Sequence, residues 1–227
     1  MAENTPSPSA MMPPEAPYSC TLCPRLVAYI KEIALAEPDW HNGPVDSFGD
    51  EAARLLIIGM APGRGGANRT GRPFTGDGAG DLLYKALAKQ GFSIGQFDRN
   101  GQDDLRLNDC MITNAVRCVP PQNKPTGEET RNCRPFLVSR LAHLPNVIAL
   151  FALGRIAHDN IISTLGLRRA AYPFGHGAEH DLHSNGRQYR LFDSYHCSRY
   201  NTNTGRLTEA MFDDVFRAVR AFLDKSI

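Results

Sequence analysis

Four short runs rich in apolar residues recur along this 227-residue chain, and stretches with helical periodicity lie between them. The runs are Leu55–Gly59, Cys110–Asn114, Val147–Ala152 and Tyr189–Tyr195. One of them, Leu55–Ile58, is apolar throughout, which is typical of a strand buried on both faces. Strands that alternate with helices favour a parallel sheet covered on both sides. We therefore predict an α/β fold, a three-layer αβα sandwich around a central, mostly parallel sheet of four strands.

Five helices are expected around this sheet. They cover residues 24–36, the segment with apolar residues from 82 to 87, a stretch within 128–141, the segment that opens at Gly154, and residues 207–222. The last helix has the clearest signals, because its apolar residues recur on one stripe. Thr208 can cap it, and Leu207 can pack against Phe212 as a hydrophobic staple.

The amino-terminal residues differ in composition from the rest of the chain. Residues 1–17 are rich in proline and small polar residues, which predicts a disordered tail. Residues 18–227 are then expected to form a single domain. No stretch approaches the length of a membrane span, and the amino terminus lacks a basic segment before an apolar run. We therefore expect a cytoplasmic protein with no membrane partner.

The six cysteines are more consistent with metal ligation than with disulfides, since a reducing compartment and a chain of this size do not favour a disulfide framework. Cys20 and Cys23 form a Cys-x2-Cys pair, and Cys118 and Cys133 flank a loop rich in proline, asparagine and glycine. Four thiolates in this pattern suit a tetrahedral zinc ion or a four-iron cluster, and the spacing does not decide between them. We expect Cys110 and Cys197 to be buried thiols without a ligand role.

A long glycine-rich loop, residues 59–80, follows the first expected strand. Glycines allow backbone to approach a ligand closely, although the composition alone also fits a flexible surface loop. The loop is not a P-loop, because the spaced lysine and following serine or threonine are missing. Ligands of open α/β sheets bind beyond the carboxyl ends of the strands. Chemistry is therefore expected in residues 59–80, 114–118 and 196–205.

Three segments in this order resemble motifs of the uracil-DNA glycosylase superfamily, in the form found in its family 5. The first comprises Met60–Gly63 and Gly71–Gly76, the second is Asn114–Cys118, and the third begins with His196–Asn201 and continues to Thr208. The resemblance extends from about Cys20 to the carboxyl terminus. It implies a DNA-repair enzyme that removes a deaminated base by hydrolysing its N-glycosidic bond.

Such an enzyme must flip the nucleotide out of the duplex and read the base in a pocket. The resemblance implies that Phe74 stacks on the flipped base and that Ala61 and Gly63 line the base site. Asn114 carries an amide that donates and accepts at once, which suits the adjacent carbonyl and imide N–H of uracil. A buried asparagine that satisfies a strand end is the alternative interpretation of Asn114.

Cleavage of the glycosidic bond generates positive charge on the sugar and negative charge on the departing base. Asp77 is expected to stabilise the sugar cation and to activate water, and His196 is expected to donate to the leaving base. Asp77 could instead cap the helix that follows, and His196 could be a satisfied histidine at a strand end. Related families have an acidic or polar residue at the position of Met60, so the resemblance implies a permissive pocket that also accepts hypoxanthine and other modified bases.

With a net charge of +1, a DNA surface must come from local arginine clusters. Arg64, Arg69 and Arg72 are expected along the DNA backbone, and Arg199 and Tyr200 on a loop that wedges into the duplex. The alternative for Arg64, Arg69 and Arg72 is ordinary solvated surface, and the alternative for Arg199 is a phosphate contact alone. We expect a monomer that binds damaged bases in double- and single-stranded DNA.

For the cysteines, the resemblance favours a 4Fe-4S cluster over zinc, with Cys20, Cys23, Cys118 and Cys133 as its ligands. A non-enzymatic, zinc-binding module that senses DNA damage is the rival hypothesis. It would keep the cysteines and arginines but need neither Asp77 nor His196.

Overall fold

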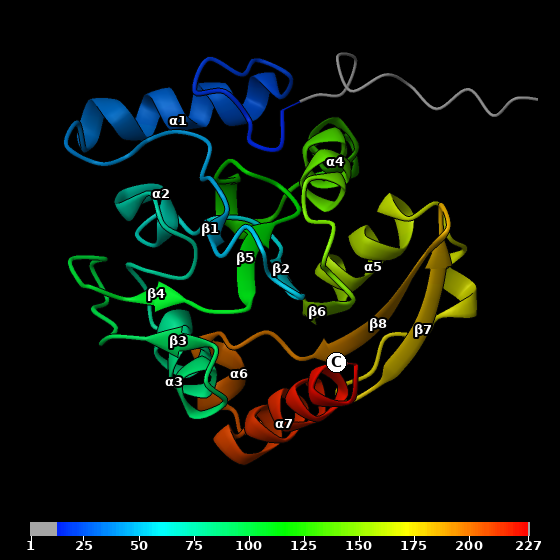
Figure 1. Cartoon of the computed structure of the whole chain (residues 1–227). Coiled ribbons are helices and arrows are strands. Elements are labelled where there is room, and N and C mark those ends of the chain that lie inside the picture. The colour runs from blue at the N-terminus through cyan, green and yellow to red at the C-terminus, as the bar shows by residue number, and fades with distance from the viewer. Residues whose placement is uncertain (1–12, 227) are drawn as a thin grey trace, which may run out of the picture.

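The four predicted strands form the centre of a six-stranded sheet in the computed structural model, which describes residues 13–226 (Figure 1). The sheet order is β1-β5-β2-β6-β8-β7. Its four central strands are mutually parallel, namely β5 (Cys110–Asn114), β2 (Leu55–Gly59), β6 (Ala149–Leu153) and β8 (Arg187–Ser194). The predicted mostly parallel α/β sheet is therefore confirmed.

The predicted strand number is too low, because an antiparallel strand is added at each edge. These strands are β1 (Phe48–Gly49) and β7 (Glu179–Ser184). A two-residue strand carries no periodic signal, and β7 is polar and largely exposed, so neither forms an apolar run. A separate two-stranded sheet pairs β3 (Ser93–Ile94) with β4 (Arg106–Leu107).

The five predicted helices are all present, and two single-turn helices occur in addition. The helices are α1 (Pro24–Ala36), α2 (Ala67–Thr70), α3 (Ala79–Lys89), α4 (Gly127–Ala142), α5 (Arg155–Thr164), α6 (Arg199–Asn203) and α7 (Glu209–Lys225). Short 3-10 segments cover Pro121–Asn123 and Arg169–Ala171. Thr208 caps α7 as predicted, since its hydroxyl accepts a hydrogen bond from the Met211 amide at 3.2 Å.

Alternate residues of the central strands point to opposite sides of the sheet and meet different helices. Leu55 and Ile57 of β2 belong to one buried cluster with side chains of α3 and α7. Leu56 and Ile58 belong to another cluster with side chains of α4 and α5. Figure 1 shows the sheet between these two helix pairs. The predicted three-layer αβα sandwich is confirmed.

Contacts between the amino-terminal segment and the rest of the domain begin at an earlier residue than the sequence predicted. The predicted disordered tail comprises residues 1–17, of which residues 1–12 lie outside the described residues. Residues 13–17 pack against the domain, where Ala16 is buried and Glu15 forms ion pairs with Arg117 and Arg140. The folded region therefore starts before Tyr18.

The parallel strands end at one edge of the sheet, so the segments that follow them gather there. Those segments begin after Gly59, Asn114, Leu153 and Ser194. Within residues 13–226, no helix combines the length and apolar character needed to cross a membrane.

Candidate active site and cysteine pocket

A cavity of about 500 Å³ opens at the carboxyl edge of the sheet. Its walls come from the glycine-rich loop after β2, the end of β5, the loop that follows β5, and the segment after β8. All six residues predicted for catalysis and base binding line it, namely Ala61, Gly63, Phe74, Asp77, Asn114 and His196. The structure thus brings together residues that lie more than a hundred positions apart in the sequence.

Asp77 lies between the glycine-rich loop and the start of α3. One carboxylate oxygen, Oδ1, accepts a hydrogen bond from the amide of Ala79, the first residue of α3, at 2.9 Å, but Asp77 is not the helix cap, because the N-cap of α3 is Gly78. The other oxygen, Oδ2, faces the loop, where a Cβ added to Gly66 would lie only 2.6 Å from it and one added to Gly63 would lie 3.0 Å away. The missing side chains of these glycines therefore make room for the carboxylate beside the cavity.

Phe74 and Asn114 meet over the last residue of β2. A Cβ on Gly59 would lie 2.4 Å from Asn114 Oδ1 and 2.8 Å from the Phe74 ring, so glycine is required there. Phe74 has a φ of +57°, a left-handed conformation that is unusual for a bulky residue and marks a constrained position. The Asn114 amide makes no hydrogen bond with any residue that the structure describes, although the residue is 3% exposed. Its hydrogen-bonding capacity is therefore available to a ligand.

His196 follows β8 and packs beside Phe74, with ring centroids 5.9 Å apart. Burial lowers the pKa of His196 below its ordinary value, and the nearby Asp77 carboxylate opposes this shift only in part. The ring is therefore neutral at pH 7. Asn201 donates a hydrogen bond to the His196 carbonyl oxygen at 2.8 Å, which anchors the backbone of this segment.

Arg199 and Tyr200 lie at the mouth of the same cavity, on the short helix α6. The Ser198 hydroxyl caps this helix by accepting a hydrogen bond from the Asn201 amide. Tyr200 is 72% exposed, which is unusual for a large aromatic side chain. Arg199 lies against Gly78, where a Cβ would meet its Nε at 2.1 Å.

The other predicted DNA-binding arginines lie in different environments. Arg64 is exposed and lines a shallow hollow that adjoins the cavity. Arg69 bonds the Gly65 carbonyl and the Asn100 side chain, so it also braces the loop. Arg72 is 14% exposed in its side chain and forms two hydrogen bonds with Asp103 at 2.6 and 2.7 Å. The structure therefore gives Arg72 a role within the fold and does not support a DNA contact for it.

Two polar residues at this edge were not among those predicted from the sequence. Asn123 lines the cavity from the proline-rich loop after β5, with a φ of +55°. The composition between Cys118 and Cys133 predicted a loop, but it did not indicate which side chain of that loop faces the cavity. Arg99 lines the adjoining hollow and forms an ion pair with Asp81.

The four predicted metal ligands converge on a second, smaller pocket. Cys20 and Cys23 precede α1, Cys118 follows β5 and Cys133 lies in α4, and all four line this pocket. None forms a disulfide. The Arg117 amide donates a hydrogen bond to Cys133 Sγ at 3.3 Å. We call this site the cysteine pocket.

Burial governs the protonation of the thiols in the cysteine pocket. Burial raises the pKa of Cys23 to about 11 and that of Cys118 to about 12, and neighbouring cysteines add to both shifts. Such thiols become thiolates only when a metal compensates their charge. Cys110 and Cys197 lie apart from the pocket and are buried, as predicted.

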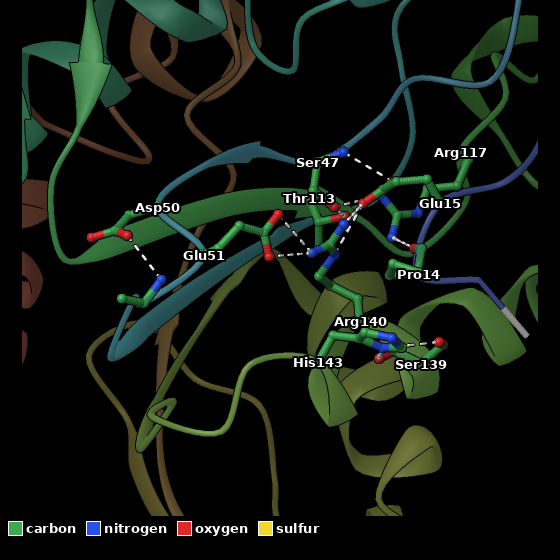
Figure 2. Close-up of polar contacts among 11 residues, drawn as sticks. Pro14, Glu15, Ser47, Asp50, Glu51, Thr113, Arg117, Ser139, Arg140 and His143 are labelled. Carbon is green, nitrogen blue, oxygen red and sulfur yellow. Dashed lines mark hydrogen bonds and ion pairs between the residues drawn. The ribbon is translucent and has the colours of Figure 1, made fainter. Parts of the chain in front are cut away.

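Polar groups pair closely beside the cysteine pocket (Figure 2). Arg117 is 1% exposed in its side chain, and its Nη1 lies 2.9 Å from Glu15 Oε2. Glu15 also pairs with Arg140, which contacts the more exposed Glu51 as well. Glu15 thus bridges two buried arginines and holds residues 13–16 against the pocket, which Ala16 helps to line.

Comparison with known proteins supports a single family. Residues 47–220 match the family described as "Uracil DNA glycosylase superfamily". The chain is 49% identical over 203 residues to a type-5 uracil-DNA glycosylase from Thermus thermophilus, covering 87% of this chain and 90% of the relative. A type-5 uracil-DNA glycosylase from Mycobacterium tuberculosis is 41% identical over 210 residues, covering 88% and 77%. A type-4 uracil-DNA glycosylase from Archaeoglobus fulgidus is 35% identical over 154 residues, covering 67% and 69%.

Proposed function

This chain belongs to the uracil-DNA glycosylase superfamily, and on that premise we propose that it hydrolyses the N-glycosidic bond of uracil in DNA and leaves an abasic site. One observation carries the proposal. A carboxylate, Asp77, and a neutral imidazole, His196, line one cavity with an aromatic ring and a free amide. Those groups match the charges that develop on the sugar and on the departing base.

Base recognition is assigned to Phe74 and Asn114. The Phe74 ring offers a stacking face to a flipped base, and Gly59 lets this ring and the Asn114 amide approach each other closely. Asn114 has no competing hydrogen bond among the described residues, so it can donate to a carbonyl and accept from the adjacent N–H. Uracil presents such a pair, and so does hypoxanthine at its Watson-Crick edge. We therefore propose that both bases are substrates, with Met60 supplying an apolar wall.

Asp77 is proposed to stabilise the sugar cation and to orient the attacking water. Its Oδ1 is held by the Ala79 amide, which fixes the carboxylate, while Oδ2 faces the space left by Gly63 and Gly66. A carboxylate held in this way needs little reorganisation as positive charge develops. His196, neutral at pH 7, is proposed to donate its ring N–H to the carbonyl oxygen of the leaving base.

DNA contacts are proposed for Arg64, Arg69, Arg199 and Tyr200, which lie around the cavity mouth or in the loop beside it. The exposed Tyr200 ring on α6 suits a wedge that fills the gap left by the flipped nucleotide. The arginines suit phosphate contacts, so binding is expected to weaken steeply with salt. The proposed acting form is a monomer on double- and single-stranded DNA.

The cysteine pocket is proposed to hold a 4Fe-4S cluster through Cys20, Cys23, Cys118 and Cys133. The spacing of the thiols supports a group larger than one ion. The four cysteine side chains line one pocket, but no three of their Sγ atoms all lie within 4.8 Å of one another. Among the described residues, a group of three ligand atoms this close occurs only outside the cysteine pocket. Such a cluster, when bound, would offset part of the negative charge of the thiolates and would join the start of α1, α4 and the loop after β5.

The decisive experiment measures base removal from a uracil-containing oligonucleotide, with alkaline cleavage of the abasic product. Asp77→Asn keeps the size of the side chain and removes only its charge. We expect the single-turnover rate to fall by roughly 10³-fold while DNA affinity stays unchanged. Asp81→Asn is the matched control, because Asp81 is an exposed aspartate in the first turn of α3, four residues after Asp77, and lies outside the cavity. A full rate in Asp77→Asn would refute the assignment, and inactivity of the wild type on uracil and hypoxanthine would refute the function.

A further inference from the structure

A second group of metal-ligating side chains lies outside both sites described above. His158 of α5, His180 of β7 and Asp193 of β8 each offer one ligand atom, and these atoms all lie within 4.8 Å of one another. Their side chains are 1%, 13% and 0% exposed, respectively. None of them lines the cavity or the cysteine pocket. We call this group the histidine-aspartate cluster.

The contacts of His158 require a proton or another cation between its Nδ1 and Asp193. Nε2 lies 2.8 Å from the Tyr172 carbonyl oxygen, which can only accept, so Nε2 carries a hydrogen. Nδ1 lies 2.8 Å from Asp193 Oδ1, which is a second acceptor. A neutral ring would therefore direct a lone pair at a buried carboxylate. Either a proton or a metal ion must occupy the Nδ1 position.

Two further atoms of the cluster lack hydrogen-bond partners. His180 Nε2 and Asp193 Oδ2 are buried, and neither forms a hydrogen bond within the described part of the chain. The two atoms lie 3.5 Å apart, close to each other but too far for a good hydrogen bond. Unsatisfied buried polar atoms are costly, and a bound ion is one of the few ways to satisfy both at once.

The surroundings of the cluster suit a metal ion as well. The Tyr172 carbonyl accepts the second ring N–H of His158, which is the outer contact that usually orients a metal-bound histidine. Phe174 packs edge-on against His158, and Tyr172 packs edge-on against His180, so apolar rings enclose the group. His180 lies on the edge strand β7 and keeps some exposure, which provides a route for entry.

We propose that His158, His180 and Asp193 form a binding site for one divalent transition metal ion of the zinc class. Two imidazoles and a carboxylate match the ligand preference of zinc, whereas calcium and magnesium prefer oxygen ligands alone. The ion replaces the proton at His158 Nδ1 and engages the unpartnered atoms of His180 and Asp193. It joins α5 to both strands of the β7–β8 hairpin, just before the segment that carries His196.

A zinc titration of the full-length protein with its cysteine pocket loaded tests this site. After dialysis against a chelator, zinc chloride is added in competition with a chromogenic zinc indicator. We expect one zinc ion per chain, and a loss of affinity of at least roughly 100-fold in His180→Ala and in Asp193→Asn. His183→Ala is the matched control, because His183 lies on the same strand but is exposed and outside the cluster.

The zinc X-ray absorption spectrum of the wild type supplies a readout that needs no variant. Zinc at the histidine-aspartate cluster gives a nitrogen and oxygen shell at ~2.0 Å, whereas zinc at cysteines gives a sulfur shell at ~2.3 Å. Circular dichroism establishes that each variant is folded. A sulfur shell, the absence of stoichiometric binding, or equal affinity in His180→Ala and His183→Ala would overturn the proposal.

Discussion

The base cavity and the surroundings of the cysteine pocket belong to the same domain but differ in whether their polar side chains have hydrogen-bond partners. In the cavity, the Asn114 amide and the His196 ring form no hydrogen bond with other described residues, although both side chains are largely enclosed. Beside the cysteine pocket, the buried guanidinium groups of Arg117 and Arg140 are engaged by Glu15 (Figure 2).

We interpret this difference as that between the proposed substrate site and the proposed cofactor site. Free polar groups cost stability, and they are retained where a substrate will satisfy them. Paired polar groups hold a fixed arrangement, which suits a resident group that never leaves. The comparison predicts that changes beside the cysteine pocket reduce stability, whereas changes in the cavity reduce the rate and leave stability almost unchanged.

Glu15→Gln should produce the largest effect, because it removes the carboxylate shared by two buried arginines. Leaving a buried charge without its partner costs about 3–5 kcal/mol. For a domain of this size, that corresponds to a fall of roughly 6–20 °C in the thermal midpoint. The measurement is thermal unfolding followed by circular dichroism, with the iron content determined on the same sample.

Glu51→Gln provides the control for this change. Glu51 binds the same Arg140, but its side chain is 69% exposed, against 22% for Glu15. An exposed ion pair contributes little, so the midpoint should move by less than about 3 °C. Equal shifts in the two variants would show that burial does not distinguish these carboxylates.

His196→Ala tests the opposite half of the comparison. Loss of one donor to the leaving group is expected to lower the rate roughly 10²–10³-fold, which corresponds to about 2.7–4 kcal/mol of transition-state stabilisation. Because the ring has no hydrogen bond to lose within the described residues, the thermal midpoint should change by only a few degrees. Single-turnover kinetics on uracil-containing DNA and thermal unfolding give the two values. A large loss of stability with an unchanged rate would reverse the assignment of His196.

Gly66→Ala asks whether the space beside Asp77 matters for catalysis. The new Cβ would lie 2.6 Å from Asp77 Oδ2, so the carboxylate must move. We expect the rate to fall at least roughly tenfold, since a displacement of this size disturbs the aligned geometry. Gly65→Ala is the control, because a Cβ there meets nothing within 4 Å. Similar rates in the two variants would mean that Asp77 tolerates displacement.

Much of this architecture could be predicted because it depends on local signals. The strand Cys110–Asn114 and the helix Pro24–Ala36 have the predicted bounds, since an apolar run and a proline at the first helical turn are readable in short windows. The residues expected for catalysis and base reading also lie together, because parallel strands deliver their carboxyl ends to one edge.

What the sequence did not reveal depends on pairing between distant residues. Arg72 lies in an arginine-rich loop, which predicted a DNA contact, but in the folded chain its guanidinium forms an ion pair with Asp103. Glu15 belongs to a segment whose composition is typical of disordered chains, yet it forms ion pairs with two arginines more than a hundred residues further along the sequence. His158 and Asp193 each look ordinary in their own elements, and only the packing of α5 against the sheet joins them.

The smallest effect concerns pH and follows from the lowered pKa of His196. A histidine that resists protonation when folded binds fewer protons than it does in the unfolded chain, where its pKa is close to 6.5. Its contribution to stability is therefore present above about pH 6.5 and is lost as the pH falls through the lowered pKa of the folded state.

His196→Gln cannot titrate, so its free energy of unfolding should decline less between pH 7 and pH 5 than that of the wild type. Denaturant unfolding at both pH values measures the difference, and His183→Gln, altered at an exposed position, should follow the wild type. Parallel declines in wild type and His196→Gln would mean that the ring titrates normally, and the cavity would then lose the neutral donor that sets it apart from the paired charges beside the cysteine pocket.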